Sequence, residues 1–275
     1  MTSFTEWTAD DAAAQIAIPG ENDDKYSRGV LGVITGSERY PGAAVLGVEA
    51  ALRTGVGMVR YLGPGRPSRL VLQRRPEAVI SSGPVQAWLI GSGMDQADRD
   101  ESSARLMAEA IGQGLPTVLD GGALDLHTGA SGPVVITPHF RELARVLGVE
   151  PGEIALDPAV WAVRAAAELG VTVLLKGHST YVAGSGTALV ARSAPTWLAT
   201  AGSGDALAGI LGALVATHAD QIVADVTLFA RLAATASVIH GLAAERASGG
   251  GPFTILDLAA AVPATIAGLI ERRNR

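Results

Sequence analysis

The sequence predicts an α/β fold in which helices cover both faces of a mostly parallel sheet. Short runs rich in Val, Ile and Leu alternate with Ala-rich segments of helical periodicity along most of the 275 residues. Several of these runs are apolar at consecutive positions, which is typical of strands buried on both faces of a parallel sheet. With 48% hydrophobic residues and no Pro- or Ser-rich linker, the chain can form one large core. We therefore expect a single three-layer α/β/α domain.

The expected elements follow one another regularly, and each helix ends near a Gly or a new strand. The expected strands are residues 30–35, 58–62, 87–91, 117–120, 134–137 and 171–176. The expected helices are residues 43–54, 100–112, 141–147, 158–169, 206–217, 226–244 and 258–269. Segments 180–183 and 187–192, separated by Gly184-Ser185-Gly186, are predicted to form a hairpin at the sheet edge. The acidic, polar residues 1–24 precede this pattern, so we expect an N-terminal extension followed by one domain, residues 25–275.

Composition excludes several classes of function. The net charge is −6 and the one basic run is residues 272–275, so nucleic acid is not expected as a partner. The chain has no Cys, and its five His residues show no i, i+4 pairing, so no protein metal site is expected. Polar residues such as Arg231 and His240 interrupt the longest apolar stretches, which favours buried helices over membrane spans. With no apolar leader segment visible, a cytoplasmic protein is expected.

The loop Gly202-Ser203-Gly204, called the anion loop below, leads directly into an apolar helical pattern, and Asp205 stands at the junction. Glycines let the backbone turn freely, and the unpaired N–H groups at a helix start attract an anion. The Asp205 carboxylate could take a proton from a hydroxyl that faces this anion, and the helix dipole should keep that carboxylate ionised. The alternative is that Ser203 or Asp205 simply caps the helix, and short Gly motifs alone leave the two interpretations at even odds.

Polar residues also follow five of the expected strands, where ligands bind in doubly wound sheets. Each has a simpler explanation as a turn former, a helix entry or a solvated strand end, but their agreement at one edge favours a binding site. They are Gly36-Ser37, Gly91-Ser92-Gly93, Asp120, Thr137-Pro138-His139 and Lys176-Gly177.

Taken in order, these segments resemble the ADP-dependent NAD(P)H-hydrate dehydratase family, a branch of the ribokinase-like fold. The motifs are Lys25–Gly29, Gly36-Ser37 with Tyr40–Ala44, Gly91–Met94, Thr137–His139, Lys176–Thr180 and Gly202–Asp205. The resemblance implies a lyase that restores hydrated NADH or NADPH (S epimer) while ADP becomes AMP and phosphate. It also implies a homotetramer. Many bacterial relatives fuse this domain behind an epimerase domain, which this chain lacks, so a separate epimerase is an expected companion.

The resemblance assigns roles position by position. Asp205 is the family's catalytic position, beside the hydrated dinucleotide, and Ala43, Gly93 and His139 contact the same substrate. Gly204 and the run Lys176, Gly177, His178, Ser179 and Thr180 contact the nucleotide. Phosphoryl transfer between two anionic ligands usually needs a divalent cation, so we expect Mg²⁺, held by phosphate oxygens and water. The low charge of helices 226–244 and 258–269 suggests a homo-oligomer.

Two positions depart from the family pattern. Gly122 replaces the second acid of Asp-Ala-Asp-Ala-Leu, which places any metal or water contact there in doubt, and Arg141 stands where Gly is usual. Arg141 either crowds the substrate or points to solvent. A small-molecule kinase of the same fold and an inactive nucleotide-binding protein are the alternatives to the dehydratase interpretation, because the Gly-Ser-Gly-Asp loop would also serve a vitamin or sugar hydroxyl.

Overall fold

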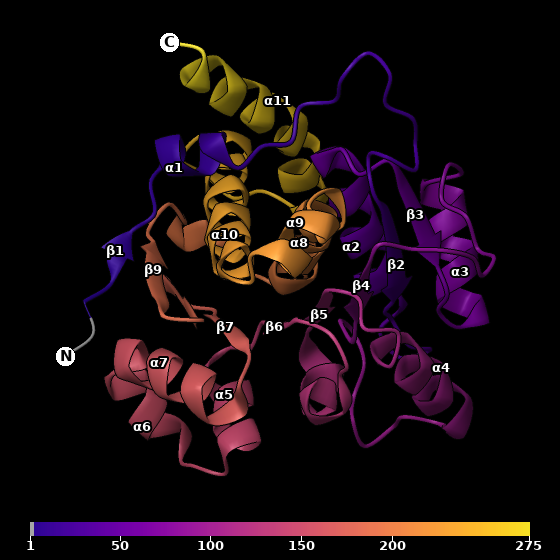
Figure 1. Ribbon diagram of the computed structural model, residues 1–275, viewed down its shortest axis with the longest axis horizontal. Coiled ribbons are helices and arrows are strands. Elements are labelled where there is room, and N and C mark those ends of the chain that lie inside the picture. Colours follow the sequence, from indigo (N-terminus) through magenta and orange to yellow (C-terminus); the bar gives the residue numbers. More distant parts are fainter. Residues whose placement is uncertain (1–2) are drawn as a thin grey trace.

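A nine-stranded sheet runs through the middle of the computed structural model, which describes residues 3–275 (Figure 1). The strand order is β1-β9-β8-β7-β6-β5-β4-β2-β3. β8 pairs antiparallel with both β7 and β9, and the other neighbouring strands are parallel. The predicted α/β class, the mostly parallel sheet and the hairpin are confirmed. The strands are β1 (Thr5–Glu6), β2 (Val30–Ile34), β3 (Met58–Tyr61), β4 (Ala87–Ile90), β5 (Thr117–Leu119), β6 (Val134–Ile136), β7 (Thr172–Leu175), β8 (Thr180–Gly184) and β9 (Thr187–Ala191).

Helices connect the strands, and most of them match the expected segments to within a few residues. They are α1 (Ala9–Ala14), α2 (Pro41–Thr54), α3 (Gly65–Arg74), α4 (Glu101–Ile111), α5 (Phe140–Leu147), α6 (Pro151–Leu156), α7 (Pro158–Leu169), α8 (Ser203–Thr217), α9 (Ala219–Ala224), α10 (Thr227–Ser248) and α11 (Ile255–Arg273), with 3₁₀ helices η1 (Gly121–Gly129) and η2 (Thr196–Leu198).

The helices form two layers around the sheet, as expected for strands that are apolar on both faces. Figure 1 shows α4 to α7 below the sheet and α8, α10 and α11 above it. Each layer has its own apolar cluster: one joins α2, α8, α10 and α11 to the sheet, and the other joins α4, η1 and α5 to α7. Every residue of β2 and β4 is buried, since both faces of these strands are covered.

Two N-terminal elements lie inside the segment expected as an extension. Thr5 and Glu6 form β1, which pairs parallel with β9 and extends the sheet at its edge. Ala12 and Ala13 of α1 are buried, and α1 packs against α10 and α11. Residues 5–14 are therefore part of the same three-layer arrangement, although their short, polar sequence has no apolar period that would predict it.

The helix α3 has no counterpart among the expected elements. Only Pro67 and Val71 of its ten residues are buried, so the sequence lacks the apolar repeat by which amphipathic helices are identified. The charged surface of α3 serves instead to hold Glu49 of α2. The Glu49 carboxylate is fully buried and accepts hydrogen bonds from Arg74 and Arg75 as well as from Arg53.

Helix α10 is an interior element of the fold. It is long and apolar enough to span a membrane by length and composition, but 83% of its most apolar window is buried inside the protein. It packs against α8, α11, α1 and the strands β6 to β9. The low charge of residues 226–244 is therefore explained by burial within one chain, and it does not by itself indicate a subunit interface.

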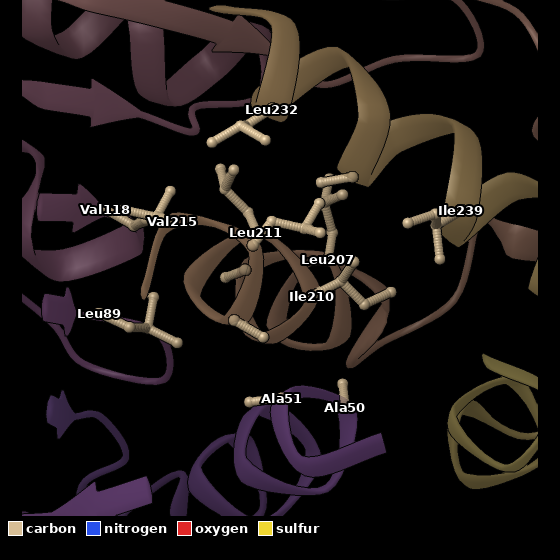
Figure 2. Packing of buried hydrophobic residues seen from close by; sticks show 14 of the residues in the cluster. Ala50, Ala51, Leu89, Val118, Leu207, Ile210, Leu211, Val215, Leu232 and Ile239 are labelled. Carbon is tan, nitrogen blue, oxygen red and sulfur yellow. The ribbon is translucent and has the colours of Figure 1, made fainter. Parts of the chain in front are cut away.

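The apolar helix α8 holds the anion loop in place. Residues 206–216 are all buried, and Figure 2 shows Leu207, Ile210 and Leu211 packed toward α2 and α10. Gly209 permits this close packing on α2, because a Cβ at this position would overlap the carbonyl group of Gly47 and lie 3.1 Å from Ala50 Cβ. The contact fixes how closely α8 approaches α2.

Gly209→Ala tests this contact. The added methyl group must push α8 from α2, which costs about 1–3 kcal/mol and outweighs the ~1 kcal/mol gain in helix propensity. We expect a net loss of unfolding free energy in denaturant titrations. Gly42→Ala in α2 is the matched control, because a Cβ there meets nothing within 4 Å. Equal unfolding free energies of the two variants would show that the α2–α8 contact can accommodate a methyl group.

The buried His240 of α10 should make the stability depend on pH. It is 5% exposed, its Nε2 has no hydrogen-bond partner within residues 3–275, and burial lowers its pKa to about 4. Between about pH 6.5 and 4 the unfolded chain binds a proton at this residue and the folded chain does not, so stability falls as the pH falls through this window. His240→Leu should remove up to about 3 kcal/mol of this loss. Unfolding free energies at pH 7 and 4.5 measure the difference, and an unchanged pH dependence would contradict it.

Candidate functional site

The predicted site residues gather at the carboxyl ends of β2 and β4 to β7, where α8 begins. A pocket of about 750 Å³ opens beside α8, and a second pocket of about 260 Å³ lies near the end of β2. Of the predicted site residues, the larger pocket is lined by His139, Lys176, Gly177, His178, Thr180, Ser203 and Gly204. Residues from six separate chain segments thus meet at one edge of the sheet, as expected for a doubly wound fold.

The anion loop has the geometry of an open helix start. Gly202 adopts φ 89°, a left-handed conformation that favours glycine, and α8 begins at Ser203. Among the described residues no side chain caps this helix. The interpretation of Ser203 or Asp205 as a cap is therefore wrong. The N–H of Ser203 donates to the carbonyl oxygen of Thr200 at 3.3 Å, while the N–H groups of Gly204 and Asp205 have no backbone partner among the described residues. They remain available to an anion.

A cation stands beside these amides. The Lys176 Nζ atom donates a hydrogen bond to Asp120 Oδ1 at 2.8 Å and lies 3.6 Å from Glu142 Oε2. A Cβ built on Gly204 would lie 3.4 Å from the same Nζ. Burial lowers the pKa of Lys176, but the charges of Asp120 and Glu142 outweigh it and raise the pKa overall. A permanent positive charge therefore faces the N-terminus of α8.

Asp120 is held by donors from three other strand ends. Its Oδ1 also accepts from Thr137 Oγ1 at 2.7 Å, and its Oδ2 accepts from Ser92 Oγ at 2.9 Å. Asp120 is only 4% exposed; burial raises its pKa, but Lys176 outweighs this and the pKa falls below its ordinary value. The sequence placed these residues at strand ends that together favour a binding site, but it assigned none of them an individual role. The signal available was their polar character at the ends of buried strands.

Asp205 has a much higher proton affinity than the helix dipole alone would give. Burial, followed by the negative charge of Asp120, raises the pKa of Asp205 to about 7, and Lys176 offsets only part of the rise. Glu142 raises it slightly further. The helix dipole was expected to favour the ionised form of this carboxylate, but desolvation and a like charge outweigh the dipole. Asp205 therefore keeps its proton to a higher pH than an ordinary carboxyl group does.

His139 is held in one tautomer by the helix it caps. Its Nδ1 accepts from the backbone N–H groups of Arg141 (3.1 Å) and Glu142 (3.2 Å) at the start of α5. Nδ1 is therefore unprotonated, and the neutral ring carries its proton on Nε2. Burial lowers the pKa of His139, so the neutral form prevails at neutral pH. His139 presents an N–H donor at the edge of the larger pocket.

Ala43 and Gly93 lie against each other near the smaller pocket. A Cβ on Gly93 would overlap the methyl group of Ala43 and lie 3.4 Å from Gly36 Cα. Their neighbours Gly36, Tyr40 and Met94 line that pocket. The two residues predicted to contact the dinucleotide are therefore close together, and their small side chains keep the strand ends of β2 and β4 near each other.

The structure explains both departures from the family pattern. A Cβ at Gly122 would lie 2.5 Å from the carbonyl oxygen of Met94, so position 122 has no space for an acidic side chain here. Arg99 donates to the carbonyl of Gly122 and to both carboxylate oxygens of Asp125. Arg141 is exposed, lies over the ring of Phe140 and is not among the residues that line the larger pocket. It does not crowd the site.

Several residues of the larger pocket could not be assigned from the sequence. They include Phe140, the segment 194–201 before the anion loop, and residues of α8 and α10 such as Leu207, Ser237 and His240. Helix α10 packs on α8 and thereby lines the pocket. No local sequence motif predicts such a contact between helices. Ser179, within the predicted nucleotide run, lies in the turn between β7 and β8 and does not line the pocket.

The donor set does not form a protein cage for a metal ion. Residues 3–275 contain no group of three or more His, Cys, Asp or Glu side chains that could hold one. Of the carboxylates around the anion loop, Asp120 and Glu142 already face Lys176. A divalent cation would therefore need the oxygens of a bound phosphate.

Comparison with known proteins gives a consistent result. The family model described as NAD(P)H-hydrate dehydratase matches residues 31–256. The bifunctional NAD(P)H-hydrate repair enzyme of Mycobacterium tuberculosis is 42% identical over 78% of this chain, and the match covers 47% of that protein. The chain thus spans about half the length of such relatives. The ADP-dependent (S)-NAD(P)H-hydrate dehydratase of Xanthomonas campestris is 32% identical over 94% of this chain and 93% of its own length.

Solved structures agree on the fold. The ADP/ATP-dependent NAD(P)H-hydrate dehydratase of Bacillus subtilis, co-crystallised with ATP and Mg²⁺, superposes with a TM-score of 0.86 at 25% identity, covering 98% of this chain and 100% of that one. A hydroxyethylthiazole kinase from Pyrococcus horikoshii shares the fold at a TM-score of 0.64 and 21% identity, covering 96% of this chain and 95% of that one. With a family match over most of its length and the ribokinase-like sheet around its anion loop, the chain belongs to the NAD(P)H-hydrate dehydratase family.

Proposed function

We propose that this protein is an ADP-dependent dehydratase that converts hydrated NADH or NADPH, in its S form, back to the reduced dinucleotide, with release of AMP and phosphate. The observation that carries the proposal is the grouping of three elements at the start of α8. These are open helix amides, the Lys176 ammonium and the Asp205 carboxylate with a pKa of about 7. Together they suit the transfer of a phosphoryl group to a hydroxyl.

The first step transfers the terminal phosphoryl group of ADP. The deprotonated Asp205 takes the proton of the substrate's ring hydroxyl, whose oxygen bonds to the β-phosphorus as the bond to the bridging oxygen breaks. AMP leaves with that oxygen. The amides of Gly204 and Asp205 and the Lys176 ammonium stabilise the negative charge on the transferred group. The Nε2–H of His139 orients the substrate by a hydrogen bond.

The second step is an elimination. The hydroxyl group itself leaves poorly, but its phosphate ester leaves readily. The ring carbon–oxygen bond breaks, phosphate departs with the electron pair, and a proton is lost from the neighbouring carbon as the ring double bond forms. The departing phosphate takes the ring proton, and Asp205 returns its proton to solvent. The sum is hydrated dinucleotide plus ADP giving reduced dinucleotide, AMP, hydrogen phosphate and one proton.

The larger pocket suits the nucleotide, and the smaller pocket near Ala43 and Gly93 suits the dinucleotide. Mg²⁺ would be carried by the nucleotide's phosphate oxygens and would offset their charge. We also propose a cytoplasmic homo-oligomer, a tetramer by likeness to the family, supplied with the S epimer by a separate epimerase activity. The chain's division into residues 1–24 and a domain of residues 25–275 remains a proposal, in which β1 and α1 pack onto the domain.

Asp205→Asn tests the proposed base. Asn keeps the size but cannot take the proton, so the rate of NADH recovery from the hydrate with ADP should fall by roughly 10²–10⁴-fold. Because the pKa is raised in the folded protein, ionised Asp205 weakens stability as the pH rises from about 4 to about 7. The variant should therefore melt higher than the wild type at pH 8. Asp220→Asn, an exposed acid in the first turn of α9, is the matched control.

Near-normal turnover of Asp205→Asn would refute the mechanism. Phosphorylation of a vitamin or sugar hydroxyl, with no recovery of NADH from the hydrate, would identify the small-molecule kinase instead. Nucleotide binding without either reaction would identify the inactive binding protein.

His139→Asn and Gly177→Val should each weaken the binding of a different ligand. Asn still accepts the two amides at the start of α5 but lacks the Nε2 donor, so the Michaelis constant for the hydrate should rise about tenfold. Gly177→Val places a branched side chain at the larger pocket and should weaken AMP binding in calorimetry. Each variant should leave the other ligand's affinity within a factor of about three. An unchanged constant for the hydrate in His139→Asn would remove this residue from the substrate site.

A further inference from the structure

Asp120 is the most buried charged residue beside the anion loop. It takes no part in the two proposed reaction steps, and the sequence motifs assign it no function. Its two oxygens receive three donors, from Ser92 after β4, Thr137 after β6 and Lys176 after β7. Ser92 and Thr137 are each 1% exposed. The Asp120 carboxylate therefore has one fixed orientation and one charged partner, the Lys176 ammonium.

We propose that Asp120 is a positioning residue of the phosphoryl transfer, which fixes the Lys176 ammonium at the anion loop and sets the charge that Asp205 faces. The inference rests on the proposed function. Asp120 is too buried and too fully bonded to touch a ligand, so its effect must pass through Lys176 and through its charge.

The first part of the role is mechanical. The Lys176 side chain is 19% exposed and could otherwise turn toward solvent, as flexible ammonium groups do. Asp120 holds Nζ at 2.8 Å, so that the ammonium stays within 3.4 Å of a Cβ position on Gly204. The alternative partner, Glu142, is more distant at 3.6 Å. Without the Asp120 charge, the ammonium loses its fixed position beside the helix amides.

The second part is electrostatic. The charged groups that face Asp205 are Asp120 from the end of β5, Lys176 from the end of β7 and Glu142 from α5. The nearby His139 and His240 both have lowered pKa values and carry no charge at neutral pH. After burial, Asp120 is the strongest influence on the pKa of Asp205. A site without its charge would hold Asp205 ionised at lower pH and make it a weaker base.

The test is the pH dependence of turnover in Asp120→Asn. The amide oxygen can still accept from Ser92 or Thr137, while the charge is lost. We expect turnover at pH 7 to fall by at least about tenfold, as for a displaced phosphoryl-binding group, and the acid limb of the kcat profile to move to lower pH. Thr137→Val is the matched control. It removes a hydrogen bond to the same carboxylate and keeps the charge, so its acid limb should coincide with that of the wild type.

An acid limb of Asp120→Asn that coincides with the wild type would overturn the proposal, and so would an equal shift in Thr137→Val. Should Asp120→Asn fail to fold, the double variant Asp120→Asn/Lys176→Met removes both charges of the pair. Its acid limb should still move to lower pH, because Asp120 affects the pKa of Asp205 more strongly than Lys176 does. An unmoved limb in the double variant overturns the proposal equally.

A second measurement separates this proposal from the proposed function. Ionisation of Asp205 makes the unfolding free energy of the wild type fall between about pH 4 and pH 7. This decline should begin and end at lower pH in Asp120→Asn, whatever reaction the protein catalyses. Absence of dehydratase activity in the wild type would refute the function, while an unshifted decline in Asp120→Asn would refute the role of Asp120.

Discussion

The ion pair between Asp120 and Lys176 is the interaction on which the site depends. A buried charge without a partner costs several kcal/mol, so neither residue could occupy this position alone. The 2.8 Å contact joins the ends of β5 and β7, and the hydroxyl groups of Ser92 and Thr137 bring in β4 and β6. The pair thereby aligns four strand ends and leaves one ammonium group facing the start of α8. The same negative charge raises the proton affinity of Asp205.

The rest of the fold holds α8 against this pair. Its eleven consecutive buried residues are enclosed by the sheet, α2 and α10 (Figure 2), and the glycine contact with α2 fixes how closely the helix approaches. The open amides of the anion loop therefore stand at a defined distance from Lys176. The arrangement also has an energetic cost. Asp205 and His240 both have pKa values far from their ordinary values, and the Nε2 atom of His240 has no hydrogen-bond partner in the part of the chain that the structure describes. Groups with such shifted pKa values lower the stability of the protein without its ligands, and they are typical of functional sites.

Much of the site was predictable because its chemistry is local. The anion loop, the strand-end position of Lys176 and the cap at His139 are each visible in a few consecutive residues. The protonation state of Asp205 was not predictable, because its pKa depends on burial and on the charge of Asp120. Asp120 lies 85 positions away in the chain, and only folding brings it near. The reading of Ser203 or Asp205 as a cap failed for a related reason. Both residues have the side chains of good caps, but the left-handed Gly202 occupies the capping position. The pocket residues of α10 also depend on packing between helices.

The sequence by itself determined the three-layer class and the succession of most strands and helices along the chain, because burial of both sheet faces leaves consecutive apolar residues that periodicity can reveal. It also located the loops that carry the chemistry. It did not determine α3, whose ten residues bury only Pro67 and Val71, nor the edge strand β1, which is ordered by its partner β9. Tertiary structure alone decided which elements enclose α10, that the exposed Arg141 lies over the ring of Phe140 and that Gly122 has no space for a side chain. These outcomes depend on the surroundings that distant segments provide, and a local sequence pattern contains no information about them.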